Sequence, residues 1–344
     1  MEKSHPFDSP EYIAEALDKF KAKNWTVQQF NDMAYEYRNL FRTLPTYPVT
    51  IKKDTVIFRG RPNEGEEDFR ELKDLGIKPS RLVKSYGRGH IPHQSAFYAS
   101  SNEETVAREV TQWYINDNGR FQDLISRRII NMKWNGSTSF MTISAWHVKE
   151  DLTLALLFNT DSKNRSPYIQ NCKNDYCNLT KGNENRLKSR KLLLDFFSTE
   201  FGKVDVKHES EYLFSAFYSS EIFANEITET QDVEFDGVKY ASIANENRGE
   251  NYAIKESSFR NKIEFLGANS CYTLNNNRRN PIEGEGKAMI GNIKTARLLL
   301  DEKTLNWIDS TDEADYWVKL DNDYLPWKLP STGSRFPKAV KRIS

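Results

Sequence analysis

The spacing of apolar side chains predicts two amphipathic helices near the start of the chain. Ile13, Leu17 and Phe20 recur at helical intervals. A second stripe is formed by Val27, Phe30, Met33, Tyr37, Leu40 and Phe41. Thr26 stands three residues before Gln29, which is typical of a capping box at the start of a helix. We therefore expect residues 1–50 to form a helical extension packed on the next unit, or alternatively a partner-binding or dimerisation arm.

After residue 50 the pattern changes to short runs of β-branched and aromatic residues, which predict strands. We expect strands at 55–58, 94–100, 127–132, 139–148, 152–158, 238–242, 251–254 and 262–266. Helical spacing predicts helices at 66–75, from 103 onward, and at 192–201, 209–227 and 293–308. The polar segment 160–190 is expected to be a long surface loop or insertion. Strands and helices without regular βαβ alternation favour an α+β fold with mixed sheets and flanking helices.

Composition and charge exclude several classes of function. The chain has 344 residues, and its 49 Lys and Arg residues balance 49 Asp and Glu residues. A nucleic-acid-binding protein normally carries a basic excess, so no nucleic-acid partner is expected. Apolar runs are far shorter than the roughly 20 residues of a membrane span, and no secretory leader is expected at the N-terminus. Three cysteines do not make a disulfide framework, so we expect a soluble protein of the reducing cytoplasm.

Familiar catalytic and metal-binding motifs are missing from the sequence. It contains no P-loop, G-x-G-x-x-G, G-x-S-x-G or H-E-x-x-H pattern. Cys172 and Cys177 form a C-x4-C pair, but a zinc site needs two more ligands at matching spacing. His208 and Cys271 are isolated in the sequence, and Pro92 separates His90 from a shared helical face with His93. No metal is therefore expected.

One set of polar and aromatic residues recurs beside expected strand ends, in a specific order. Phe58-Arg59-Gly60-Arg61 leaves the first strand, Gly87-Arg88 precedes a strand that contains Tyr98-Ala99, and Thr105 to Val110 opens a helix with Glu109. Asp236-Gly237 leads into a strand that ends at Ser242, and Asn251 follows. Each piece alone is common on protein surfaces, whereas their order and spacing together are specific.

This constellation resembles the RES-domain family, toxins of toxin–antitoxin systems that degrade NAD+ and whose fold is similar to diphtheria-toxin-like ADP-ribosyltransferases. The resemblance covers roughly residues 55–256. Ala241 stands where the family usually has proline, and Val106 where it has alanine. The interval from Glu109 to Ser242 is longer than in compact members, which implies inserted structure.

The resemblance implies an enzyme that cleaves the nicotinamide–ribose bond of NAD+, as an NAD+ phosphorylase with inorganic phosphate as co-substrate or as an NAD+ glycohydrolase. The implied catalytic residues are Glu109, Arg59 and Ser242, and the implied NAD+-binding residues are Arg59, Arg88, Tyr98, Ser242 and Asn251. Protein ADP-ribosylation with the same pocket and a catalytically inactive binding module are the alternatives.

The residue types suit this chemistry. An arginine fork binds phosphate oxygens bidentately, which fits Arg59 and Arg88. The ring of Tyr98 can stack on nicotinamide. Departure of nicotinamide builds oxocarbenium character, which a carboxylate such as Glu109 stabilises.

The expected organisation follows from the resemblance. Residues 1–50 form the helical extension, 51–266 the RES-like catalytic domain with the polar insertion around 160–190, and 267–344 a C-terminal region. Because NAD+ depletion is toxic, we expect an inhibitory antitoxin or other regulatory partner, or a role as a defence effector. Homo-oligomerisation is left open.

Overall fold

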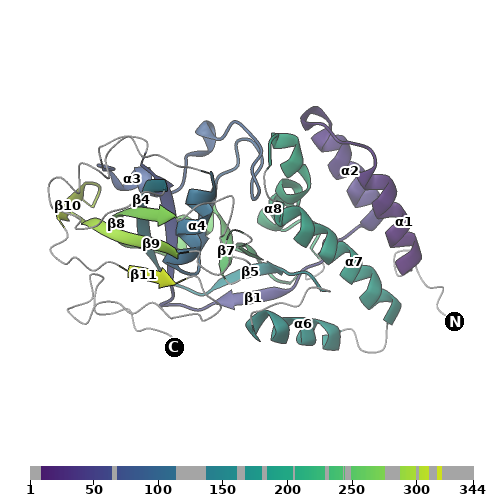
Figure 1. Cartoon of the computed structure of the whole chain (residues 1–344). Helices are drawn as coiled ribbons and strands as arrows, with labels where there is room; N and C mark the ends of the chain where they lie inside the picture. The colour runs from purple at the N-terminus through teal and green to yellow at the C-terminus, as the bar shows by residue number, and fades with distance from the viewer. Residues whose placement is uncertain are drawn as a thin grey trace. The chain divides into compact units, whose positions relative to one another are not determined.

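The computed structural model describes residues 9–63, 68–113, 137–160, 167–179, 184–203, 206–228, 232–242, 244, 249–275, 287–299, 302–309 and 316–319. The chain divides into two compact units, each assembled from three separate segments. The first unit holds Met1–Lys52, Ile77–Tyr98 and Asp151–Lys262, and the second holds Lys53–Gly76, Ala99–Glu150 and Ile263–Ser344. Both units combine strands with helices (Figure 1), which confirms the expected α+β class.

The strands of the first unit form a mixed arrangement. They follow the order β1 (Pro48–Ile51), β5 (Leu152–Leu157), β6 (Gly237–Ala241), β7 (Glu250–Lys255) and β3 (Ala96–Ser100), whose last two residues belong to the second unit. β5 and β6 are parallel, whereas β1–β5 and β6–β7 are antiparallel. The expected strands at 94–100, 152–158, 238–242 and 251–254 are therefore confirmed within two residues at either end.

Helices account for much of the first unit. In the described part of this unit they are α1 (Pro10–Lys21), the short η2 (Val27–Gln29), α2 (Phe30–Phe41), η3 (Ser80–Leu82), α6 (Pro167–Leu179), α7 (Glu184–Phe201), η4 (Glu209–Tyr212), α8 (Leu213–Ala224) and α9 (Glu256–Lys262). α7 packs against both α1 and α8 (Figure 1). Phe20 and Tyr37 are fully buried here, with ring centroids 5.9 Å apart. The Thr26 N–H donates to Gln29 Oε1 (3.2 Å), which confirms the capping box.

The strands named in the second unit pair in antiparallel fashion. The order β2 (Val56–Pro62), β4 (Ser137–Val148), β8 (Ile263–Asn275), β9 (Lys287–Leu298) and β10 (Leu305–Asp309) is joined by β11 (Tyr316–Lys319), which pairs with β9. Among the residues described in this unit, the helices are α3 (Leu72–Leu75) and α4 (Glu103–Trp113). Asn102 caps α4, because its Oδ1 accepts the Thr105 N–H at 2.8 Å.

The prediction of a helix at 293–308 is wrong, because this segment contains the end of β9 and most of β10. Asn269 lies opposite Thr295 and Trp307 opposite Ala296, so main-chain pairing on both sides holds β9 in a sheet. Ile293 and Ala296 are both buried, at a spacing of three that also fits a helix. Long-range strand pairing, which is not visible in local spacing, decides the outcome.

The polar segment 160–190 is not a long loop, because α6 and the start of α7 lie within it. Ile169, Cys172 and Tyr176 are buried at helical intervals, so a few apolar residues suffice to fix α6. The helix expected at 66–75 is limited to α3, and residues 64–67 lie outside the described residues. The strand expected at 127–132 also lies outside them. Among the described helices, none has the length and apolar character needed to cross a bilayer.

Candidate functional site

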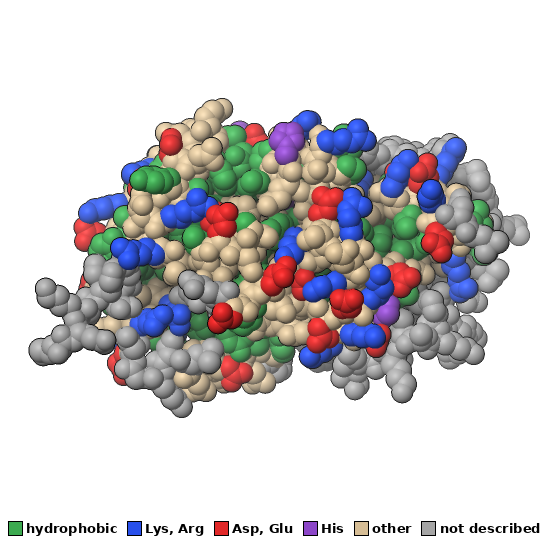
Figure 2. Space-filling view, turned by 180° about the vertical axis from the view of Figure 1, so that it is seen from behind, with side chains coloured by type: hydrophobic (Ala, Val, Ile, Leu, Met, Phe, Trp, Pro, Cys, Tyr) green, Lys and Arg blue, Asp and Glu red, His purple; other side chains and the backbone are tan. Residues whose placement is uncertain are grey.

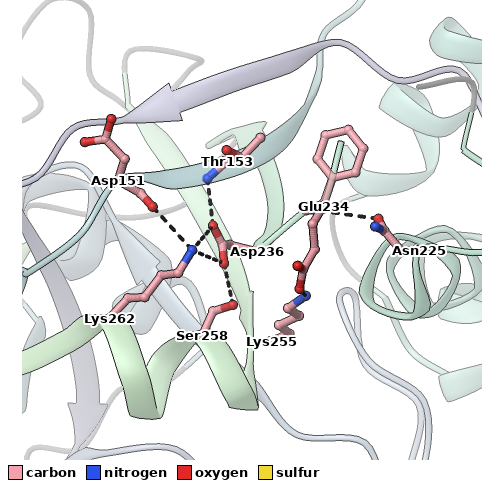
Figure 3. Close-up of polar contacts among 9 residues, drawn as sticks. Asp151, Thr153, Asn225, Glu234, Asp236, Lys255, Ser258 and Lys262 are labelled. Carbon is pink, nitrogen blue, oxygen red and sulfur yellow. Dashed lines mark hydrogen bonds and ion pairs between the residues drawn. The ribbon is translucent and has the colours of Figure 1, made fainter. Parts of the chain in front are cut away.

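The Asp236-Gly237 pair has a structural explanation. Asp236 is 4% exposed, and its carboxylate accepts hydrogen bonds from the Thr153 N–H (2.8 Å) and the Ser258 hydroxyl (2.6 Å). Lys262 Nζ lies 2.9 Å from Oδ1 of the same carboxylate (Figure 3). The buried carboxylate of Asp236 thus connects the beginning of β5 to α9. Asp236 therefore has a structural role just before the start of β6.

Gly237 is required by a close approach of two strands. A Cβ atom at this position would lie 2.2 Å from the Ala253 carbonyl oxygen and 2.9 Å from Ile254 Cα. These neighbours are main-chain atoms of β7 and cannot rotate away. The Asp-Gly sequence therefore sets how closely β6 runs beside β7.

Ser242 and Asn251 lie on the same face of the β6–β7 pair. Tyr240 is directly opposite Asn251, and the Ser242 N–H donates to the Gly249 carbonyl (2.9 Å) at the next step of the same register. Because side chains alternate along a strand, Tyr240, Ser242 and Asn251 share one face. Ser242 is 0% and Asn251 4% exposed, so both polar groups are buried.

Tyr98 and the Gly87–His90 turn come to this face as well. A Cβ on Gly89 would lie 2.7 Å from Ala253 Cβ, and Ala253 shares the face of Asn251 by alternation. The Tyr98 hydroxyl oxygen accepts the Gly89 N–H (2.7 Å) and lies 2.7 Å from His90 Nδ1. The turn itself closes by the Gly87 N–H donating to the His90 carbonyl (3.0 Å).

His90 is held in its neutral form at pH 7. Burial, reinforced by the nearby Lys78 ammonium, lowers the pKa of His90 to about 4. A neutral imidazole Nδ1 either accepts the Tyr98 proton or donates its own, depending on the tautomer. In either case this contact and the Gly89 N–H fix the position of the phenol oxygen.

Arg88 is bound within the first unit. Its Nη1 donates to the Phe201 carbonyl (2.6 Å) and its Nη2 to the Lys203 carbonyl (2.7 Å). These carbonyls lie at the C-terminal end of α7, where a cation complements the helix dipole. The Phe201 ring contacts the ring of Tyr240, 5.0 Å between centroids. Four of the sequence-derived candidates, Arg88, Tyr98, Ser242 and Asn251, are thus arranged around one face of β6–β7.

Arg59 and Glu109 belong to the second unit. Gly60 of β2 lies under α4, since a Cβ there would be 2.5 Å from Val106 Cγ1 and 2.6 Å from Val110 Cγ2. By strand alternation, Arg59 points to the face of β2 opposite to α4. Its carbonyl accepts the Ser144 hydroxyl at 3.1 Å. Glu109 is a partly exposed residue of α4. Because α4 covers the face of β2 on which Gly60 lies, Glu109 and the Arg59 side chain are on opposite sides of β2.

Three groups of contacts are not visible in the sequence. The spacing of His90 suggests only a metal ligand and not the contact with Tyr98, and the α7 carbonyls that hold Arg88 carry no sequence signal. Lys239, on the opposite face of β6, is 6% exposed, lies 2.7 Å from Glu250 and sits 4.3 Å from the ring centroid of Tyr168. A lysine between Val238 and Tyr240 in a buried strand is the one available signal for this cluster.

Metal-binding side chains do not cluster in the described part of the chain. Cys172 and Cys177 both lie on α6, and no group of three His, Cys, Asp or Glu residues among the described residues is arranged to hold a metal. On the face shown in Figure 2, Lys and Arg side chains are interspersed with Asp and Glu.

The chain matches no family model and no curated protein.

Proposed function

We propose that the chain cleaves the nicotinamide–ribose bond of NAD+, by phosphorolysis or hydrolysis, with a RES-like fold. One observation supports this most strongly: Tyr98, Ser242 and Asn251, from three distant sequence positions, lie around one face of the β6–β7 pair beside the Gly87–His90 turn. The order of motifs that resembles the RES-domain family thus corresponds, in the first unit, to a spatial grouping.

The proposed roles follow from residue chemistry. Ser242 and Asn251 supply hydroxyl and amide groups for ribose or phosphate oxygens, and Tyr98 offers its ring to nicotinamide. Arg59 binds phosphate oxygens through its guanidinium. Glu109 stabilises the oxocarbenium character that develops as nicotinamide leaves.

The contacts of Arg88 change its proposed role. Its guanidinium is engaged by two main-chain carbonyls, so Arg88 positions the Gly87–His90 turn beside Tyr98. Arg59 and main-chain N–H groups are then proposed to bind the NAD+ phosphates.

A specific observation favours a second candidate, a RES-like binding module without turnover. Arg88 and the Tyr98 hydroxyl are both engaged in internal contacts, and Arg59 leaves β2 on the face opposite to α4, which carries Glu109. A binding module would retain the fold and the buried polar groups while lacking the carboxylate function of Glu109.

Product analysis separates these possibilities. The purified chain is incubated with NAD+, with and without inorganic phosphate, and the products are resolved by chromatography. ADP-ribose 1-phosphate formed only with phosphate indicates phosphorolysis, ADP-ribose indicates hydrolysis, and label from NAD+ retained on protein indicates ADP-ribosylation. Bound but unchanged NAD+ would favour the binding module.

An inhibitory partner, an antitoxin or another regulatory protein, belongs to the same proposal. An enzyme that depletes NAD+ harms the cell that makes it unless it is restrained. Expression of the chain alone should therefore slow growth in step with a fall in cellular NAD+. Growth arrest at unchanged NAD+ would contradict this part of the proposal.

A further inference from the structure

A cavity of about 690 Å³ opens in the first unit beside the C-terminal end of α7. Its wall is formed by the turn between α1 and η2, the end of α7, and η4 with the start of α8. The side chains that matter here are Lys21, Trp25, Glu200, Lys203, Glu211 and Phe214. None of them is a candidate residue for NAD+ cleavage, so the proposed activity does not account for this cavity.

Glu200 is the most unusual group in the wall. It is 7% exposed, and burial raises the pKa of its carboxyl, although Lys203 acts in the opposite direction. Lys203 Nζ forms an ion pair with Glu200 Oε2 at 2.5 Å, and no other described residue donates a hydrogen bond to this buried oxygen. Because a carboxylate oxygen has about two acceptor sites, Glu200 Oε2 can accept a further hydrogen bond from a ligand in the cavity.

The wall offers more acceptors than donors. It carries three carboxylates, Glu200, Glu209 and Glu211, against the ammonium groups of Lys21 and Lys203. An ionised carboxylate has about four acceptor sites. Glu211 Oε1 accepts two main-chain N–H groups and Glu209 Oε2 accepts the Tyr86 N–H (3.1 Å), which leaves acceptor capacity unused. A donor-rich cation complements this wall better than an anion.

Aromatic rings supply the second half of the recognition. The Trp25 indole is fixed by its N–H, which donates to the Phe20 carbonyl (2.9 Å). Lys23 Nζ lies 5.3 Å from the Trp25 ring centroid, and Lys203 Nζ lies 6.0 Å from that of Phe214. Both rings thus already have cations near them, the arrangement that cation–π attraction favours.

We infer that this cavity binds a guanidinium group carried on an apolar stem. A guanidinium has five N–H donors in a plane, which suits several carboxylate oxygens, and it stacks on aromatic faces better than an ammonium does. One N–H donates to Glu200 Oε2, and the plane of the group lies against the Trp25 ring. The stem contacts Leu213 and Phe214, which line the same cavity.

The test is calorimetric titration of the full chain with n-butylguanidinium, with n-pentanoate as a probe that has the same butyl stem and the opposite charge. Saturable binding of n-butylguanidinium is expected, weakened about tenfold or more by Glu200→Gln, which removes a charge-assisted hydrogen bond. Trp25→Leu should weaken it as well. Glu15→Gln is the matched control, because Glu15 lies on α1, is exposed and pairs with Lys19 outside the cavity.

N-acetylarginine amide, titrated in parallel, identifies the source of the group. Tighter binding of the amide than of n-butylguanidinium indicates an arginine side chain of a partner protein, and the reverse order indicates a free small molecule. The inference is overturned if neither guanidinium probe gives saturable binding, if n-pentanoate binds as tightly as n-butylguanidinium, or if Glu200→Gln binds n-butylguanidinium like the wild type. If Glu200→Gln does not fold, Trp25→Leu decides, and wild-type affinity there overturns the inference.

Discussion

Two glycines of the candidate motifs, Gly237 and Gly60, are close to different kinds of neighbouring atoms. The nearest atoms to a Cβ on Gly237 belong to the main chain of β7, whereas those near Gly60 are the ends of valine side chains. Main-chain atoms move only if the strand pairing changes, while a valine methyl can shift. Crowding should therefore be more costly at Gly237 than at Gly60.

Gly237→Ala is expected to lower the free energy of unfolding by about 1–3 kcal/mol, the usual cost of overpacking. Gly60→Ala is the matched comparison and should cost less. Denaturant titration of the three proteins measures both effects. Equal midpoints for Gly237→Ala and the wild type would show that β6 and β7 do not approach as described.

His90 gives the first unit a pH dependence of predictable sign. Its folded pKa, about 4, lies below the usual value of 6.5, because burial penalises the charged ring. Between these pH values the unfolded chain binds more protons than the folded chain, so stability falls as the pH is lowered from about 6.5 to about 4. Above 6.5 this contribution is fully present.

The variant His90→Asn removes the titration while keeping a polar group near Tyr98. Its loss of stability between pH 6.5 and 4 should be smaller than that of the wild type, measured by thermal unfolding at several pH values. His93→Asn is the control, since His93 is exposed and has a positive φ of 63°, which asparagine tolerates. A wild-type pH slope in His90→Asn, or a reduced slope in His93→Asn, would contradict this assignment.

At the scale of elements, Arg88 joins a turn to the end of a helix. Arg88→Lys keeps the charge but cannot reach the Phe201 and Lys203 carbonyls with two separate nitrogens. A loss of about 1.5–3 kcal/mol in unfolding free energy is expected, the range for a hydrogen bond to a charged group. Arg81→Lys, at an exposed position of the same segment, should be neutral in the same denaturant titration. Equal stability of the two variants would remove the proposed positioning role.

Local sequence patterns predict the elements that local forces determine. The stripes of α1 and α2, the Thr26–Gln29 capping box and the strands around β6 and β7 follow from apolar spacing and turn chemistry. β9 and β10 could not be predicted, because their strand form depends on pairing with β8 and with each other. The polar composition of α6 does not predict a helix, although three of its residues are buried at helical spacing.

The candidate site was predictable in part for the same reason. Strand register places Ser242 beside Asn251, and the sequence order of the motifs suggested that grouping. The partners of Arg88 and Tyr98 were not predictable, because they are main-chain groups of α7 and a histidine ring brought near by the fold. Likewise, no sequence pattern indicates that Arg59 and α4 lie on opposite faces of β2.

For the molecule as a whole, the proposed NAD+ cleavage depends on a carboxylate that lowers the barrier to nicotinamide loss. A unit charge pair at ~4 Å and an effective dielectric of 20 is worth about 4 kcal/mol, and half of that corresponds to a roughly 30-fold change in rate. Glu109 is the residue to which this contribution is assigned. Glu104, on the same helix and 3.0 Å from Arg108, provides a matched carboxylate without an assigned role.

The most direct measurement is the rate of nicotinamide release from NAD+ by the wild type, Glu109→Gln and Glu104→Gln, with and without phosphate. Release of nicotinamide by the wild type is expected, with a rate lowered about 30-fold or more in Glu109→Gln and a rate near that of the wild type in Glu104→Gln. Wild-type release by Glu109→Gln, or no release by the wild-type chain under either condition, would contradict this expectation.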